Sequence, residues 1–259
     1  MADRTQGRVR ESRDRFAGVM MITVRKAESI YVAEGRIENG TFQGRWHFSF
    51  GENYDPEHMH FGTLRVFNDD TLSPGAVWPL HPHRDIEVVT YCAAGEFRHA
   101  DQKGKGGVLQ KGWVQHTTVG QGLFHSEINN RPDEPMRFIQ MWFVPEKPGL
   151  TPSVEHKEVE QSERTDTLLP LVSNEDPGAL RIASDAKVYS CLLQKGKTLS
   201  YTFAEGYGGY LYVLEGGAIS ANGEALRHLD AATIVREPDL RIEAEGDAEL
   251  LLVVVPTKE

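Results

Sequence analysis

Three features of the sequence predict an all-β fold. Apolar or aromatic runs of about four to six residues recur at roughly ten-residue spacing. Glycine, proline, asparagine and aspartate separate these runs at the positions expected of turns. Residues 138–144 form a near-continuous apolar run, which is typical of a strand buried on both faces. The pattern indicates a sandwich or barrel and not an alternating α/β chain.

In the first half of the chain, the folded body is expected to begin at residue 21. Residues 1–20 are polar and have no sustained apolar period, so we expect a flexible N-terminal head. Strands are then expected at 21–24, 30–32, 46–50, 64–67, 86–91, 97–99, 108–110 and 138–144. Turn sequences such as Glu38-Asn39-Gly40 and Ser73-Pro74-Gly75 punctuate them.

The second half of the chain repeats the strand pattern and predicts a second domain. Residues 145–177 carry five prolines and a charged block at 155–163, as expected of a connection with a solvated stretch or short helix. We therefore expect a domain over 21–150 and another over 151–259. Strands are expected at 187–193, 198–203, 209–216, 233–235, 240–242 and 249–255. The segment 212–216 resembles 89–95, each a strand running into a glycine turn, which suggests an internal repeat.

Composition excludes several classes of function. A net charge of -10 disfavours direct binding of nucleic acid or of an anionic membrane, because both need a basic surface. No apolar run approaches the roughly 20 residues of a membrane span, and no signal-peptide pattern is present. The two cysteines, Cys92 and Cys191, are far apart, as expected of reduced buried thiols. These features predict a soluble, cytoplasmic protein.

Two short pairs of donor residues carry the chemistry. They are His81-Pro82-His83 and His125-Ser126-Glu127. Residues two apart on a strand point to the same face, so each pair delivers two ligands in one direction. If the two strands lie together, three imidazoles and one carboxylate converge on one point. This donor set suits one divalent first-row metal, among Fe(II), Mn(II), Ni(II), Cu(II) and Zn(II), with positions left for a small molecule.

Other polar residues near these pairs have more than one interpretation. Glu87 follows His83 by four residues, so it either orients a ligand imidazole or is a polar residue at the rim. Four further histidines could line the pocket, but each is more often a surface or structural histidine; they are His58, His60, His99 and His116. The second domain has aromatic residues at 207–212 where a second ligand pair would lie, so we expect a barrel without metal there.

The motifs together resemble those of a known family. Gly75-x5-His81-x-His83-x3-Glu87-x7-Gly95 is close to the first signature of the cupin superfamily of small metal-binding β-barrels, and His125-x3-Asn129 resembles the second. The His-Pro-His-Arg segment, the segment 54–59 and Gly120-x-Gly122-x-x-His125-Ser126-Glu127 are similar to the pirin family. The resemblance covers about residues 21–160 closely and the rest loosely. Lys111, Trp113, His116 and Thr117 depart from the family pattern, which concerns the shape of the pocket.

The resemblance implies a fold, a metal and an activity. The implied fold is a bicupin, two packed β-barrels with few short helices. The implied metal ligands are His81, His83, His125 and Glu127, with Fe(II) as the usual metal. Several pirin-like proteins are quercetin 2,3-dioxygenases, which open a flavonol ring with O₂ and release carbon monoxide. In that case Glu127 also serves as the catalytic general base for the flavonol hydroxyl.

Two alternatives remain open at this stage. Some pirins are non-catalytic, iron-binding regulators that respond to redox state and act through a protein partner. The charge of -10 means that such a role would not involve direct contact with DNA. A sugar isomerase of the cupin type is the weaker alternative, because the sequence has no phosphate-binding cluster.

Overall fold

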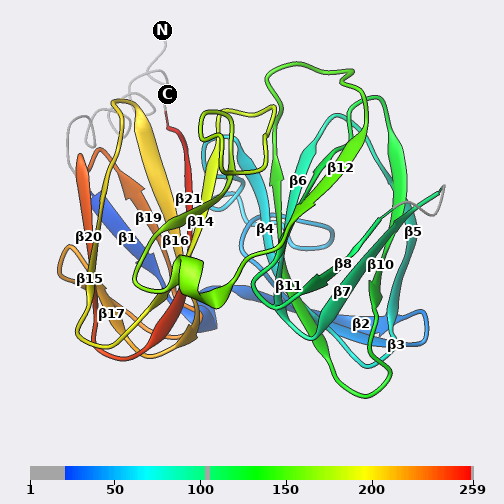
Figure 1. The fold of residues 1–259 in the computed structure, drawn as a ribbon, viewed down its shortest axis with the longest axis horizontal. Helices are drawn as coiled ribbons and strands as arrows, with labels where there is room; N and C mark the ends of the chain where they lie inside the picture. The colour runs from blue at the N-terminus through cyan, green and yellow to red at the C-terminus, as the bar shows by residue number, and fades with distance from the viewer. Residues whose placement is uncertain (1–20, 103–105, 258–259) are drawn as a thin grey trace, which may run out of the picture.

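The strands of the computed structural model form two antiparallel β-barrels that lie side by side (Figure 1). The structure describes residues 21–102 and 106–257, so the predicted flexible head at 1–20 lies outside the described residues. Within them there is no α-helix, only the 3-10 helices η2 (Ala27–Ser29) and η3 (Gln161–Arg164). No described segment forms a helix of the length and hydropathy that a membrane span requires. The all-β prediction is confirmed.

The first barrel consists of a seven-stranded and a four-stranded sheet, drawn in blue, cyan and green in Figure 1. In spatial order, the seven-stranded sheet contains β12 (Ser153–Lys157), β9 (Val114–Thr118), β6 (Glu87–Ala94), β11 (Met136–Phe143), β4 (Leu64–Leu72), β3 (Gly40–Trp46) and β2 (Tyr31–Ile37). The four-stranded sheet contains β5 (Val77–His83), β10 (Leu123–Asn129), β7 (Glu96–Asp101) and β8 (Val108–Gln110).

The second barrel has the same plan, with a six-stranded and a four-stranded sheet. In spatial order, the larger sheet contains β1 (Met21–Arg25), β19 (Ala231–Val235), β16 (Tyr207–Gly216), β21 (Ala248–Pro256), β14 (Lys187–Leu193) and β13 (Leu169–Ser173). The smaller sheet contains β15 (Thr198–Thr202), β20 (Asp239–Ala244), β17 (Ile219–Ala221) and β18 (Glu224–Leu226).

Two strands connect the barrels more closely than their position in the chain suggests. β1 pairs along its whole length with β19, so the first described strand belongs to the sheet of the second barrel. β12, which follows residue 150, pairs with β9 of the first barrel. In Figure 1 the blue β1 accordingly lies among the orange strands. The predicted domain boundary at residue 150 stays a prediction, and these two pairings cross it.

The hairpin of β2 and β3 shows how turn residues set the register. Ile37 lies opposite Gly40, which leaves Glu38 and Asn39 as a two-residue turn. Asn39 has a φ of 60°, the left-handed conformation that asparagine adopts more readily than most residues. The turn that the sequence predicts at 38–40 is therefore where β2 ends and β3 begins.

The strand predicted over residues 46–50 is wrong. β3 ends at Trp46, and Phe50 makes only an isolated bridge with Asn53. The aromatic residues here pack against other rings rather than into a ladder. Phe50 lies edge-on to Trp46 at 5.0 Å and to Trp142 at 5.3 Å between ring centroids.

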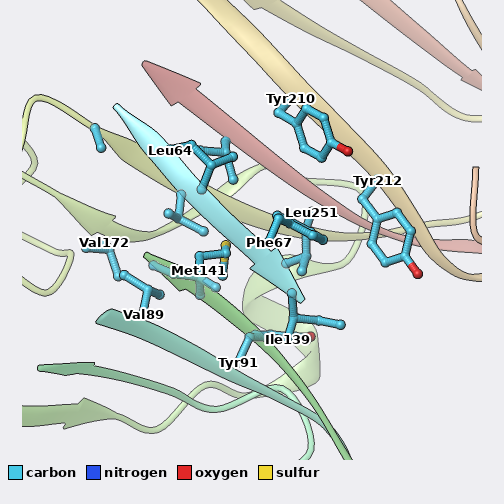
Figure 2. Packing of buried hydrophobic residues seen from close by; sticks show 14 of the residues in the cluster. Leu64, Phe67, Val89, Tyr91, Ile139, Met141, Val172, Tyr210, Tyr212 and Leu251 are labelled. Carbon is cyan, nitrogen blue, oxygen red and sulfur yellow. The ribbon is translucent and has the colours of Figure 1, made fainter. Parts of the chain in front are cut away.

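Successive side chains along the central strands of the first barrel point alternately into that barrel and towards the second barrel. On β11, Phe138 packs into the first barrel, whereas Ile139 and Met141 belong to the cluster that also contains residues of the second barrel. The run at 138–144 is thus buried on both faces, as predicted. Figure 2 shows Phe67, Ile139 and Met141 gathered near Tyr210, Tyr212 and Leu251 of the second barrel.

A buried polar cluster crosses this apolar interface between the barrels. Asp69 on β4 accepts two hydrogen bonds from the Arg137 guanidinium, at 2.7 and 2.6 Å, and one from the Tyr212 hydroxyl at 2.5 Å. Arg137 also donates to the carbonyl of Leu214 at 3.2 Å. Because Asp69 is buried, removal of its carboxylate would leave Arg137 without its main partner in the interface.

We expect Asp69→Ala to lower the free energy of unfolding by about 3 kcal/mol, because breaking the buried ion pair leaves the charge of Arg137 buried without its partner. Urea denaturation at neutral pH measures this change. Arg241→Ala, which breaks the exposed pair with Glu243, is the control and should cost less than about 1 kcal/mol. Equal effects of the two substitutions would contradict the role of Asp69.

Candidate metal centre

The two predicted donor pairs lie on adjacent strands of one sheet. β5 carries His81 and His83, β10 carries His125 and Glu127, and His125 is directly opposite His81 in the register. β5 lies at the edge of the four-stranded sheet, where Pro79 and Pro82 cost no ladder hydrogen bond to a second neighbour. A bulge interrupts the pairing between His125 and Glu127, and bulges of this kind re-aim side chains.

The donor atoms of His81, His83 and His125 all lie within 4.8 Å of one another. Nε2 of His125 is 3.1 Å from Nε2 of His81, and Nε2 of His83 is buried with no hydrogen-bond partner among the described residues. Two nitrogens bound at a right angle to one ion, each about 2.0–2.1 Å from it, are about 3 Å apart. The three residues therefore fit a shared divalent metal.

A backbone contact fixes the tautomer of His81. Its Nδ1 donates to the carbonyl of Pro79 at 2.7 Å, and a carbonyl oxygen can only accept. In the neutral ring the remaining nitrogen, Nε2, then carries a lone pair and faces the cluster. Metal-ligating histidines usually have their second nitrogen held in this way.

Burial keeps the other two imidazoles neutral. Desolvation, with a smaller contribution from His81, lowers the pKa of His83 to about 4. Desolvation and the neighbouring imidazoles of His81, His99 and His83 lower the pKa of His125 to about 2. Since a metal binds only the deprotonated ring, both side chains are available as ligands at neutral pH.

Glu127 is buried close to the histidines. Burial raises the pKa of its carboxyl group, and both His81 and a hydrogen bond from Gln140 act in the opposite direction. The three donors that lie within 4.8 Å of one another are all histidines, so the role of Glu127 as a fourth ligand stays a prediction. A buried carboxylate with a raised pKa is also a stronger base than an exposed one.

Two residues of β11 reach the site from the opposite sheet. Gln140 donates from its amide nitrogen to Oε1 of Glu127, and its amide oxygen accepts from Nε1 of Trp142 at 2.9 Å. The Trp142 ring also lies edge-on to His83, with 4.7 Å between centroids. Gln140 was not identified from the sequence, although it is the one amide in an otherwise apolar run.

His99 also belongs to the site. It lies on β7, is buried, and its Nε2 is 2.9 Å from Nδ1 of His125. The prediction that His99 is more often a structural histidine gave no indication of this contact. The contact cannot be foreseen from local spacing, because His99 and His125 are far apart in the sequence and only the pairing of β7 with β10 brings them together.

Glu87 and His116 form a separate buried pair away from the donor cluster. Nε2 of His116 lies 2.7 Å from Glu87, which also accepts from the Thr118 hydroxyl and from the backbone N–H of Ala183, both at 3.1 Å. Glu87 begins a new strand after Asp85, which has a φ of 50°. Both interpretations of Glu87 from the sequence are wrong, because Glu87 is buried and binds His116, which is not one of the three clustered histidines. His58 instead binds Asp55 at 2.7 Å, and His60 contacts the carbonyl of Gly62.

These features define a bicupin whose first barrel carries three clustered histidines that could hold a metal ion. Residues 28–143 match the pirin family, and residues 171–255 match the quercetinase C-terminal cupin domain. The chain belongs to the pirin family.

Similar proteins agree with this assignment along almost the whole chain. A pirin-like protein of Caulobacter vibrioides is 38% identical over 221 residues, which cover 85% of this chain and 94% of the relative. A quercetin 2,3-dioxygenase of Escherichia coli K12 is 31% identical over 237 residues, covering 91% of this chain and 99% of the relative. A crystal structure of a bacterial pirin from Escherichia coli in complex with nickel(II) superposes with a TM-score of 0.84 at 30% identity, covering 92% of this chain and all of that one.

We expect the metal-free protein to lose stability as the pH falls below about 6.5. In the unfolded chain His125 binds a proton near pH 6.5, whereas in the folded protein its pKa is about 2, so protonation favours the unfolded state. The contribution of His125 approaches about 1.4 kcal/mol per pH unit between these limits. Urea denaturation with chelator present, at several values between about pH 6.5 and pH 5, measures the slope. His125→Gln should have a shallower slope, and an unchanged slope would contradict a buried neutral His125.

Proposed function

We propose that the protein is a quercetin 2,3-dioxygenase, which opens a flavonol ring with O₂ at a mononuclear iron centre. The observation that carries the proposal is the convergence of three imidazole nitrogens beside a buried, basic carboxylate. The activity named for the Escherichia coli relative supports the same reaction.

The metal would be held by His81, His83, His125 and Glu127, and we propose Fe(II) as the ion. Imidazole and carboxylate donors suit iron as well as nickel, which occupies the related bacterial pirin. A divalent ion at this position supplies Lewis-acid chemistry, since it lowers the pKa of a hydroxyl group that coordinates it.

Glu127 is the proposed general base of the reaction. Its carboxylate would take the proton of the flavonol 3-hydroxyl, and its raised pKa makes it suited to accept that proton. Gln140 holds the carboxylate through an N–H donated to Oε1, and Trp142 fixes which end of the Gln140 amide faces Glu127. The orientation of the base thus depends on two residues that cannot themselves exchange protons.

The surroundings of the site suit a planar aromatic substrate. Trp142 lies beside His83 and packs against Phe50, so rings line one side of the histidine cluster. A cavity of about 570 Å³ is lined in part by Asp101 of β7, Leu123 of β10 and His156 of β12, and by none of the four proposed metal ligands. Its volume is within the range of pockets that hold small organic ligands, and Asp101 is directly opposite His125.

The test of this proposal is anaerobic loading with Fe(II), followed by oxygen uptake with quercetin and detection of carbon monoxide. Wild type should consume O₂ and release carbon monoxide in equal amounts. We expect His81→Ala and His125→Ala to lose metal binding and ring opening together, because each removes one of the three converging nitrogens. Flavonol breakdown by these variants would overturn the proposal. Wild type that binds iron without oxygen uptake would favour the regulatory alternative.

A second prediction concerns Gln140. Gln140→Leu should lower kcat by about 10-fold to 100-fold, because a hydrogen bond to a charged group contributes about 1.5–3 kcal/mol. Steady-state kinetics with quercetin measure kcat and KM separately, after metal content is shown to be equal. Gln115→Leu is the matched control, since Gln115 is also buried but its amide contacts Thr117. An unchanged kcat in Gln140→Leu would show that the reaction does not depend on the hydrogen bond from Gln140 to Glu127.

A further inference from the structure

The histidine cluster is one continuous chain of ring contacts that ends on the backbone. Nε2 of His99 meets Nδ1 of His125 at 2.9 Å, and Nε2 of His125 meets Nε2 of His81 at 3.1 Å. Nδ1 of His81 ends the chain at the carbonyl of Pro79, at 2.7 Å. Each contact is at hydrogen-bond distance, so with no ion between the rings each is a hydrogen bond that holds one proton between its two atoms.

The end of this chain determines where the protons lie. The Pro79 carbonyl only accepts, so a neutral His81 carries its proton on Nδ1 and presents a lone pair at Nε2. The proton in the next contact must then come from Nε2 of His125. Nδ1 of His125 is left as an acceptor, and Nε2 of His99 donates to it. With no ion at the centre, all three bonds point from His99 towards Pro79.

An ion at the centre requires the opposite arrangement at two of these rings. His125 can bind a metal through Nε2 only if that nitrogen has a lone pair, which moves its proton to Nδ1. Nε2 of His99 must then accept, so His99 carries its proton on its own Nδ1. The charge of both rings is unchanged. Each ring gives up one proton and takes up another, so no net proton is released.

We propose that His99 is a positioning residue, whose hydrogen bond with His125 reverses direction when the site takes up a divalent metal. The inference rests on His125 being a metal ligand, as proposed above. An imidazole is suited to this role because it can donate or accept at the same nitrogen, whereas a carboxylate or carbonyl can only accept. The 3.1 Å separation of the two Nε2 atoms fits both a hydrogen bond and two nitrogens sharing one ion. The heavy atoms of the His125–His81 contact therefore need not move when the metal enters. The proton of His99 then lies on Nδ1, which is buried with no hydrogen-bond partner among the described residues.

The direct test is long-range ¹H–¹⁵N NMR of histidine-labelled full-length protein, without metal and with Zn(II), which is diamagnetic. The spectra report which ring nitrogen carries hydrogen. We expect His125 to change from the Nε2–H to the Nδ1–H form on addition of Zn(II), and His99 likewise to move its proton from Nε2 to Nδ1. The same tautomer of His99 in both samples would overturn the inference.

Zn(II) affinity of variants gives an independent measurement. His99→Leu should weaken Zn(II) binding by about 10-fold to 100-fold, because Nδ1–H of His125 then lacks an acceptor. His99→Gln should recover part of this affinity, since its amide can accept at one atom and donate at the other. His116→Leu and His116→Gln are the matched controls, because His116 is equally buried but binds Glu87. Urea denaturation shows whether each variant is folded.

The outcomes separate this inference from the proposed function. Zn(II) affinity in His99→Leu equal to that of wild type contradicts the role of His99 and leaves the dioxygenase proposal standing. Equal loss of affinity in the His99 and His116 variants also contradicts it, because the effect would then be general. A wild type that binds neither Zn(II) nor Fe(II) contradicts both proposals, whereas the tautomer change without oxygen uptake supports His99 alone.

Discussion

The pairing of β5 with β10 is the constraint on which the site depends. It places His125 opposite His81, and alternation along both strands then directs His83 to the same point. A shift of one residue in this register would turn every side chain of the moved strand to the other face of the sheet. The short strand β7 completes the arrangement, since it pairs with β10 and brings His99 against His125.

β11 links the site to the interface between the barrels. Its even-numbered residues Gln140 and Trp142 face the donor cluster, and its odd-numbered residues Ile139 and Met141 pack against the second barrel. Packing between the barrels thus fixes β11, and Gln140 on β11 in turn donates the hydrogen bond that positions Glu127. Among the described residues, the one cluster of three metal donors lies in the first barrel.

The sequence alone predicted what is determined by local pattern. Alternating and continuous apolar runs predicted the strands, and two-residue spacing predicted that His81 and His83 share a face. Prediction from the sequence failed where contacts between distant parts of the chain determine the local structure. The aromatic residues over 46–50 suggest a strand, but Phe50 packs against Trp142 instead. Glu87 has the spacing of a partner for His83, but it lies on β6 in the other sheet and binds His116 instead.

The supporting residues were the hardest to foresee. Gln140 and His99 reach the site through strand pairings that no local spacing reveals, and a buried amide or histidine has no signature of its own.

The pairing of β1 is also a long-range contact. Its partner, β19, is synthesised only after residues 26–230, so β1 lacks its partner strand during most of synthesis. Such late closure by distant segments slows folding and exposes the waiting strand to wrong partners.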